Sequence, residues 1–507
     1  MAIIKAMNPA TGELMANIEE TKIEQIHKLY ADSRKAFASW SQLSIKERIG
    51  YLKQLKSVIV LEMDDIAKVI VNDTGKVPTE AITADIMPTI DALDQTIKHA
   101  EKLLAPKKVK TPIFLFGKKS LVEYMPRGVV LVISPWNYPL QLALVPVISA
   151  LVSGNTVILK PSEVTPTVGK CMEELFKKAN FPHGVVQVAH GGKEVGAKLT
   201  EEKPDYIFFT GSVQTGKIIQ EVAAKQLIPT TLELGGKDPF IVFADANMER
   251  AAKAAVWAAF TNSGQVCMSA ERIFVERTIF NKFLEIVKKE TESLIQDRSK
   301  EADIGSMTFP DQKEIVKRQV RAALCEGAQL ITGEHPDDWD ESMFIKPLIL
   351  TNITADMEIF REETFGPVLP MIPFDTEEEV INLANQSEYG LNASIFTSNM
   401  KKGRRVARKL ISGAVVLNDV IVSVANHYLP FGGTKQSGIG RYHGEHGLTI
   451  FCHEKAIVVD RGKRMRELQW YPYKGTYEQF LRLFQSYFSD KRNWAVFLKT
   501  YLKLLKK

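Results

Sequence analysis

Two short segments of the chain contain a thiol and a carboxyl group that together could carry out acyl chemistry. Cys267 lies in the run Thr-Asn-Ser-Gly-Gln-Val-Cys-Met, and Glu233 lies upstream in Leu-Glu-Leu-Gly-Gly-Lys. A thiolate adds to a carbonyl carbon, and a carboxylate accepts a proton from the thiol or from a later water. Alone, each residue is ordinary, since cysteine often serves as a small core residue and glutamate as solvated surface. The turn-forming residues before Cys267 predict a loop, which favours a nucleophile.

A rigid turn is expected directly after a buried strand at residues 129–133. It reads Ser-Pro-Trp-Asn-Tyr-Pro, and its two prolines restrict the backbone around Asn137. An Asn amide together with a backbone N–H could stabilise the oxyanion that forms when a thiolate adds to an aldehyde. The alternative interpretation is that Asn137 only stabilises the turn.

Two other segments indicate a nucleotide site at the carboxyl ends of strands. A strand at residues 206–209 leads into Thr-Gly-Ser-Val-Gln-Thr-Gly, where Gly211 and Ser212 open a helix as phosphate-binding turns do. Lys160 and Glu163 follow another predicted strand, and Glu163 could accept hydrogen bonds from ribose hydroxyls. An ordinary turn, or a helix start with Glu near the positive dipole end, would explain the same residues.

The length of 507 residues predicts two or three domains. Strand–helix alternation begins at Gly128, and a second such pattern runs from Phe240 to about Asn418. Helical periodicity dominates the first hundred residues, with one long helical run expected from Leu43 to Val71. A Lys-rich segment between Ala105 and Pro126 predicts a hairpin. The expected fold class is therefore α/β, with two doubly wound parallel-sheet domains in series.

Four scattered cysteines form no CxxC pair or metal-ligand spacing, so we expect no metal site and a reducing compartment. The first residues show no signal-peptide pattern, which predicts a cytoplasmic location. Residues 461–507 hold 12 Lys and Arg against 3 Asp and Glu, whereas the whole chain has a net charge of +5. The preceding residues are thus mildly acidic, and no nucleic-acid partner is expected there.

Seven motifs occur in one order along the chain, and the set resembles the NAD(P)-dependent aldehyde dehydrogenase superfamily over roughly residues 5 to 460. They are Pro-Trp-Asn-Tyr-Pro, Leu-Lys-Pro-Ser-Glu, Phe-Thr-Gly-Ser-x-x-x-Gly, Leu-Glu-Leu-Gly-Gly-Lys, Asn-Ser-Gly-Gln-x-Cys, Glu-Glu-Thr-Phe-Gly-Pro-Val and Pro-Phe-Gly-Gly-x-Lys-x-Ser-Gly.

The resemblance implies a role for each matching residue. Cys267 would form a thiohemiacetal and then a thioester, Glu233 would activate the deacylating water, and Asn137 would bind the oxyanion. The implied cofactor-binding residues are Lys160 and Glu163 at the adenosine ribose, Gly211 and Ser212 at a phosphate, Glu363 and Phe365 at the nicotinamide ribose and ring, and Trp136.

The resemblance also implies a domain arrangement. It consists of a Rossmann-like cofactor-binding domain at 1–105 and 126–233, a catalytic domain at 234–442, an oligomerisation hairpin at 106–125 and 443–460, and a helical tail at 461–507. A hairpin of this kind predicts a homodimer or homotetramer.

The carboxylates at two positions decide finer points of the expected reaction. Relatives that acylate coenzyme A generally lack the carboxylate of Glu233, so its presence favours release of the free acid. Glu163 should repel a 2′-phosphate, which favours NAD over NADP. A reductase or a coenzyme A-acylating enzyme on the same fold is the enzymatic alternative. A silent scaffold protein is the alternative from another class, although Cys267 and Glu233 are both present.

The motifs Pro-Trp-Asn-Tyr-Pro and Arg-Tyr-His-Gly look like the class 3 branch, which includes the fatty aldehyde dehydrogenases.

In the tail, apolar residues recur at helical spacing with lysines largely off that stripe: Trp494, Phe497, Leu498, Tyr501 and Leu505. A basic amphipathic helix of this kind is typical of proteins that bind an anionic membrane surface. Its apolar face could instead pack on the body or on a partner subunit. We expect a peripheral enzyme that oxidises a hydrophobic, medium- to long-chain aldehyde.

Overall fold

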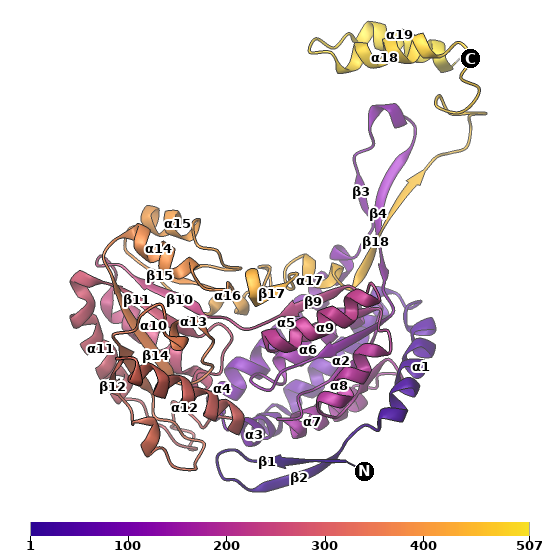
Figure 1. Cartoon of the computed structure of the whole chain (residues 1–507). Coiled ribbons are helices and arrows are strands. Elements are labelled where there is room, and N and C mark those ends of the chain that lie inside the picture. Colours follow the sequence, from indigo (N-terminus) through magenta and orange to yellow (C-terminus); the bar gives the residue numbers. More distant parts are fainter. Residues whose placement is uncertain (1, 506–507) are drawn as a thin grey trace. The chain divides into compact units, whose positions relative to one another are not determined.

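The computed structural model describes residues 2–505, which form two compact units (Figure 1). The first unit consists of the residues up to Ala105 together with Tyr124–Lys455. The second consists of Pro106–Glu123 together with the chain from Ala456 onward. The first unit contains both large sheets, so the α/β fold class expected from the sequence is confirmed.

A six-stranded sheet in the order β17-β9-β8-β5-β6-β7 supplies the edge on which the nucleotide site was predicted. Its central strands are parallel and fully buried, as their continuous apolar runs predicted. The edge strand β17 pairs antiparallel with β9, because it enters from far along the chain and not through a helical crossover. The strands are β5 (Val129–Ile133), β6 (Thr156–Lys160), β7 (Val186–Val188), β8 (Tyr206–Thr210), β9 (Thr230–Glu233) and β17 (Gly438–Ile439).

A seven-stranded sheet in the order β12-β13-β14-β11-β10-β15-β16 forms the second layer of strands in the first unit (Figure 1). It is parallel except for β12, which pairs antiparallel with β13 at the edge. The strands are β10 (Asp238–Val242), β11 (Ala270–Glu276), β12 (Gln329–Thr332), β13 (Leu348–Thr351), β14 (Val368–Phe374), β15 (Ser394–Phe396) and β16 (Val416–Leu417).

Helices cover both sheets and bury their apolar faces in contiguous cores. Helices around the six-stranded sheet are α1 (Ile23–Trp40), α2 (Ile45–Leu61), α3 (Met63–Thr74), α5 (Met87–Leu103), α6 (Gln141–Val152), α7 (Pro166–Lys178), α8 (Lys193–Glu201) and α9 (Val213–Lys225). The seven-stranded sheet has α10 (Met248–Phe260), α11 (Phe280–Glu292), α12 (Pro310–Cys325), α14 (Glu377–Asn385) and α15 (Met400–Ala407).

Two details of the first hundred residues differ from the sequence prediction. The helical run expected from Leu43 to Val71 is two helices, α2 and α3, which meet at Glu62. The chain also begins with an antiparallel pair, β1 (Ile3–Met7) and β2 (Leu14–Glu19), which helical periodicity did not reveal. Most side chains of this pair are exposed or half-buried, so the strands lack a clear apolar pattern.

The second unit combines the predicted hairpin with two tail helices. Strand β3 (Lys107–Val109) pairs antiparallel with β4 (Lys119–Pro126), and β18 (Cys452–Val459) completes a three-stranded sheet. The tail forms α18 (Tyr477–Phe488) and α19 (Trp494–Leu505), whose inner faces pack together.

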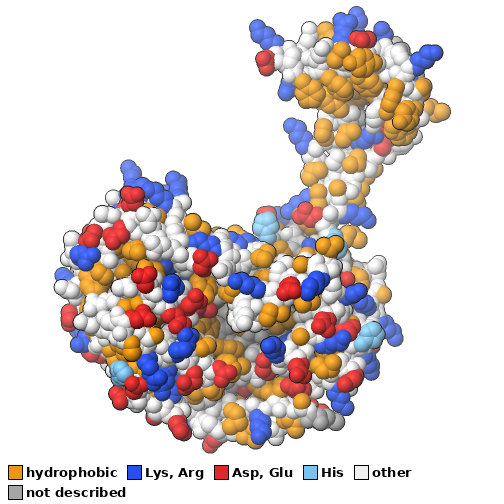
Figure 2. Space-filling view, in the orientation of Figure 1, with side chains coloured by type: hydrophobic (Ala, Val, Ile, Leu, Met, Phe, Trp, Pro, Cys, Tyr) orange, Lys and Arg blue, Asp and Glu red, His pale blue; other side chains and the backbone are white. Residues whose placement is uncertain are grey.

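The apolar stripe predicted for the tail is divided between an inner and an outer face. Phe497 and Tyr501 are buried between the helices, whereas Trp494, Leu498 and Leu505 remain exposed. Figure 2 shows hydrophobic side chains gathered on the visible face of this unit, with Lys and Arg side chains at its margin. Across residues 2–505, every helix is too short or too polar to span a bilayer.

Candidate active site

Cys267 follows a strained loop that links α10 to β11. Asn262 and Ser263 have left-handed backbone conformations, with φ of 52° and 55°, and Gly264 follows at 73°. Non-glycine residues rarely occupy this region, so surrounding contacts must hold them there. The Ser263 hydroxyl donates to the carbonyl of Gly305 at 3.0 Å, which fixes the loop that presents the cysteine.

The sulfur of Cys267 is kept neutral by its surroundings. The residue is half-buried, yet the pKa of its thiol is raised well above the ordinary value. Removal from water is the largest cause, and the carboxyl groups of Glu363, Asp238 and Glu233 add to it. Attack on a carbonyl therefore requires a base that takes the thiol proton when substrate is bound.

Asn137 lies between β5 and α6, in the turn predicted to hold it rigidly. Its side-chain amide donates to the backbone carbonyl of Gln265 at 3.0 Å, two residues before the cysteine. The backbone carbonyl of Asn137 accepts from the side-chain amide of Asn262 at 3.1 Å. Asn137 is 3% exposed. Gln265 is the one acceptor of the Asn137 amide within residues 2–505, so its second proton can meet an oxyanion.

Glu233 ends strand β9 and is held out of water. Neither carboxyl oxygen has a hydrogen-bond partner among residues 2–505, and the side chain is almost fully buried. Burial raises the pKa of Glu233 well above its ordinary value, and the charge of Arg441 opposes that change. A carboxyl group can accept a proton only in its ionised form. The fraction of molecules in which Glu233 can act as a base therefore increases with pH.

Most of the predicted site residues converge on one cleft of about 490 Å³. Eight of the predicted site residues line this cleft: Trp136, Asn137, Gly211, Ser212, Glu233, Cys267, Glu363 and Phe365. Lys160 and Glu163 lie outside that lining, at the carboxyl end of the neighbouring strand β6. Their ammonium and carboxylate are 2.6 Å apart.

The carboxyl ends of three strands meet at this edge of the six-stranded sheet. Ile133 pairs with both Lys160 and Phe209, so β5, β6 and β8 end side by side. The chain then turns closely at Gly211, where a β-carbon would lie 2.5 Å from the ring of Phe209. Helix α9 begins directly after Ser212. The close turn at Gly211, the N-terminus of α9 and the carboxylate of Glu163 after β6 together fit a dinucleotide.

Glu363 and Phe365 occupy fixed positions opposite that edge. The backbone N–H of Gly236 donates to Glu363 at 2.9 Å, and burial raises the pKa of Glu363 to about 8. Phe365 has a left-handed φ of 52°, and its ring meets that of Trp136 edge-on at 5.4 Å. Both side chains are thus restrained before any ligand binds.

Glu271 and Lys237 support this region and were missed by the sequence analysis. The carboxylate of Glu271 accepts from the backbone N–H groups of Thr364 and Phe365, and Lys237 donates to it at 2.6 Å. Lys237 belongs to the Leu-Glu-Leu-Gly-Gly-Lys run. A lysine directly after this mostly apolar run indicates a charge that needs a buried partner. Its partner could not be identified, because Glu271 lies in a different segment.

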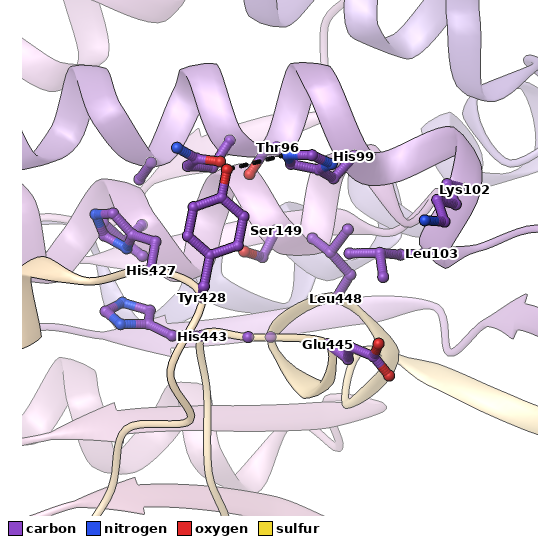
Figure 3. A pocket seen from close by; sticks show the side chains of 15 residues that line it. Thr96, His99, Lys102, Leu103, Ser149, His427, Tyr428, His443, Glu445 and Leu448 are labelled. Atoms are coloured by element: carbon purple, nitrogen blue, oxygen red, sulfur yellow. Dashed lines mark hydrogen bonds between the residues drawn. The ribbon is translucent and has the colours of Figure 1, made fainter. Parts of the chain in front are cut away.

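A second cavity of about 370 Å³ lies between α5, α6 and the chain around residues 427–448 (Figure 3). His99 hydrogen-bonds the hydroxyl of Tyr428 at 3.2 Å, and the rings of His427 and His443 are 4.4 Å apart. Burial keeps the pKa of His443 well below its ordinary value, so this ring is neutral near pH 7. Val145 of α6 lines this cavity, one helical turn from Leu142, which lines the cleft.

Comparison with known proteins gives consistent matches over most of the chain. The family model described as "Aldehyde dehydrogenase family" matches residues 2–457. A 4,4'-diapolycopene aldehyde oxidase from Methylomonas sp is 40% identical, over 95% of this chain and 90% of that protein. A 4,4'-diaponeurosporen-aldehyde dehydrogenase from Staphylococcus aureus is 33% identical, over 91% of this chain and 99% of that protein.

Solved structures agree with these matches. The NAD+ complex of an aldehyde dehydrogenase from Bacillus cereus has a TM-score of 0.86 and 34% sequence identity. The similarity covers 91% of this chain and 94% of that one.

Proposed function

The chain belongs to the aldehyde dehydrogenase family, and from that premise we propose that it oxidises a hydrophobic aldehyde to the free carboxylic acid with NAD. The observation that supports this most directly is the shared cleft. A thiol, a carboxyl group and an amide donor line the same 490 Å³ space as a phosphate-binding type of turn. Oxidation of a carbonyl through a covalent thiol adduct needs these groups together.

The reaction begins with addition of the Cys267 sulfur to the aldehyde carbon. As the C–S bond forms, the thiol proton leaves for a base, and the carbonyl oxygen becomes an oxyanion. The free amide proton of Asn137 and the backbone N–H of Cys267 stabilise that charge. Gly211, Ser212, Glu363 and neighbouring residues would hold NAD, whose chemistry would be to accept a hydride. Loss of that hydride from the substrate carbon, as the oxyanion returns to a carbonyl, converts the adduct on Cys267 into a thioester.

Water then releases the acid from the thioester on Cys267. Glu233, once ionised, removes a proton from the attacking water. The carbon–sulfur bond breaks, and the sulfur regains a proton. Because this step needs only water and a carboxylate, the free acid is the product, and coenzyme A is not required.

The substrate is proposed to be a medium- to long-chain apolar aldehyde, as in the fatty aldehyde branch that the sequence resembles. Two similar proteins are named 4,4'-diapolycopene aldehyde oxidase and 4,4'-diaponeurosporen-aldehyde dehydrogenase. Leu142 of the cleft and Val145 of the second cavity lie one helical turn apart on α6, and we propose that the two spaces join there. A long chain could extend through both while its aldehyde end remained at Cys267.

The tail is proposed to bring the enzyme to an anionic membrane surface, where such aldehydes dissolve. The outer faces of α18 and α19 expose apolar side chains, among them Phe488, Trp494 and Leu498. Basic residues in the same helices, such as Lys499 and Lys503, complement an anionic headgroup layer. We further propose a cytoplasmic homodimer or homotetramer that associates through the hairpin.

The experiment that tests this function is NADH formation across a panel of aldehydes from short to long aliphatic, aromatic and amino-aldehydes. We expect kcat/KM to increase with chain length, and free acid to appear without coenzyme A. Cys267→Ala should abolish NADH formation, whereas Cys325→Ala, at an exposed thiol, should leave it unchanged. NADH production by the Cys267→Ala protein would contradict the mechanism.

A further inference from the structure

We propose that Lys76 and Asp85 form a positioning pair that holds the oxyanion-binding amide of Asn137 in place. This inference rests on the proposed aldehyde oxidation and adds a function for two residues outside the cleft. Both side chains are fully buried, and the Lys76 ammonium is 2.8 Å from the Asp85 carboxylate. The same ammonium donates to the backbone carbonyl of Asn137, also at 2.8 Å.

The pair holds the turn that carries the amide at two points. Lys76 binds the carbonyl of Asn137 in the middle of the turn, and its ammonium lies 4.1 Å from the centre of the Tyr138 ring. The second carboxylate oxygen of Asp85 accepts from the backbone N–H of Gln141, the first residue of α6, at 3.1 Å. The turn between β5 and α6 is therefore restrained at its middle by Lys76 and where it enters α6 by Asp85.

The segment that carries the pair also contacts the loop before the nucleophile. Glu80 accepts from the hydroxyl of Thr261 and from the backbone N–H of Asn262, both at 2.8 Å. One stretch of chain, residues 76–85, thus restrains the amide donor and the nucleophile loop together. This stretch runs into the π-helix η1 (Ala81–Ile86). π-Helices are rare in proteins, and those that occur are often found at functional sites.

The backbone of Lys76 is itself fixed. Gly75 ends α3 in a left-handed conformation with φ of 75°, and its carbonyl accepts from the N–H of Ser306 at 3.0 Å. Thr308 donates through its hydroxyl to the carbonyl of Thr74 and through its N–H to the side chain of Gln265. The Lys76 ammonium therefore extends from a rigid backbone segment toward the Asn137 turn.

Stability alone is a poor reason for burying these charges. Replacing a buried ion pair by apolar residues of similar volume is often neutral or stabilising. A carboxylate and an ammonium with fixed hydrogen-bond directions do, however, determine the position of a turn more narrowly than apolar packing does. A placement error of about 1 Å at a catalytic group can lower the rate about a hundredfold.

The test is a double-mutant cycle between the pair and the amide. Lys76→Met/Asp85→Asn removes the ion pair without leaving an unpaired charge, and it is made in the wild-type and Asn137→Ala backgrounds. Single-turnover NADH formation should fall about 10- to 100-fold in the first background and less than about threefold in the second. The KM for NAD should change less than about twofold, because the cofactor edge is untouched.

A matched control separates positioning from general packing. Arg48 is another buried cation whose guanidinium donates to backbone carbonyls, those of Val152 and Leu43, away from the cleft. Arg48→Met should lower the melting temperature and leave the single-turnover rate within about twofold. If the double variant does not fold, Lys76→Gln/Asp85→Asn, which keeps two polar side chains and no charge, replaces it in the same cycle.

The outcomes distinguish this inference from the proposed function. Equal losses in both backgrounds, or a folded pair variant with the wild-type rate, would overturn the positioning role while leaving aldehyde oxidation intact. A wild-type protein that forms no NADH from any aldehyde would instead overturn the proposed function.

Discussion

A β-carbon added to Gly264 would lie 2.1 Å from the carbonyl oxygen of Gly366. The loop before Cys267 and the segment after Phe365 therefore approach each other more closely than any side chain permits. Gly264 also has a left-handed φ of 73°, so glycine is required there twice, by backbone conformation and by space.

Gly264→Ala should destabilise the protein by more than about 2 kcal/mol and lower kcat at least about tenfold, because the nucleophile loop must move. Gly12→Ala is the matched control, since Gly12 has nearly the same φ of 72° but nothing within 4 Å of the added carbon. It should cost only the backbone strain, about 1 kcal/mol, and leave kcat unchanged. Melting curves and steady-state kinetics of both variants check this, and equal effects would contradict the close approach.

Glu233→Gln should separate the two halves of the reaction. Without a carboxylate to activate water, we expect one equivalent of NADH in a burst, followed by turnover reduced by at least about a hundredfold. Because the pKa of Glu233 is raised by burial, wild-type turnover should increase with pH beyond the range of ordinary glutamates. Rapid-mixing measurement of NADH checks the burst. Full turnover by the variant would assign the base to another residue.

Protonation of Glu363 should link stability to pH. Its pKa is 4.5 in an unfolded chain and about 8 in the folded protein. Between these values only the folded state holds the proton, so its contribution to stability is lost as pH rises from 4.5 to 8. Glu363→Gln removes this dependence, so its melting temperature should fall less than that of the wild type over the same interval. Glu362→Gln, at the exposed neighbour, should follow the wild type.

Glu163 should determine the choice of cofactor. A carboxylate at the ribose repels a 2′-phosphate, so Glu163→Gln should shift the ratio of kcat/KM for NADP over NAD upward by about tenfold. Glu194→Gln, an exposed carboxylate in the first turn of α8, should leave the ratio unchanged. A wild-type enzyme that prefers NADP would contradict the proposed cofactor.

The outer face of the tail should bind anionic vesicles. Phe488→Ser/Trp494→Ser/Leu498→Ser changes three side chains that are 69%, 51% and 57% exposed. It leaves in place the residues that are buried between the helices: Leu483, Phe497, Tyr501 and Leu504. We expect co-sedimentation with phosphatidylserine-containing vesicles to be lost, and turnover of a short aldehyde to be retained. Leu227→Ser, at an exposed leucine of the first unit, is the control. Sedimentation that does not change in the triple variant would end the membrane proposal.

Much of the fold could be predicted from the sequence because its central strands are continuous apolar runs. The strand predicted at 129–133 is β5 to the residue. The edge strands β12 and β17 could not be predicted to be antiparallel, since pairing direction depends on which distant segment reaches the edge. The inner and outer faces of the tail helices could not be distinguished from the sequence either. Residues of the same apolar stripe pack between the helices in some positions and remain exposed in others.

The candidate site was predictable where a motif carries its own chemistry, as at Cys267 and Asn137. Its supporting residues were not, because each acts through a partner far away in the sequence. Lys76 contacts Asn137 and Glu271 contacts Phe365 only in the folded chain. Sequence spacing contains no information about such pairs.

A sulfur that stays protonated at neutral pH is a slow target for peroxide and for iodoacetamide, since both reagents consume thiolates. The resting protein should therefore survive oxidative conditions that inactivate enzymes with a permanently ionised cysteine. Its vulnerability would be confined to the brief interval of turnover, when the proton has left and the aldehyde competes for the same electron pair.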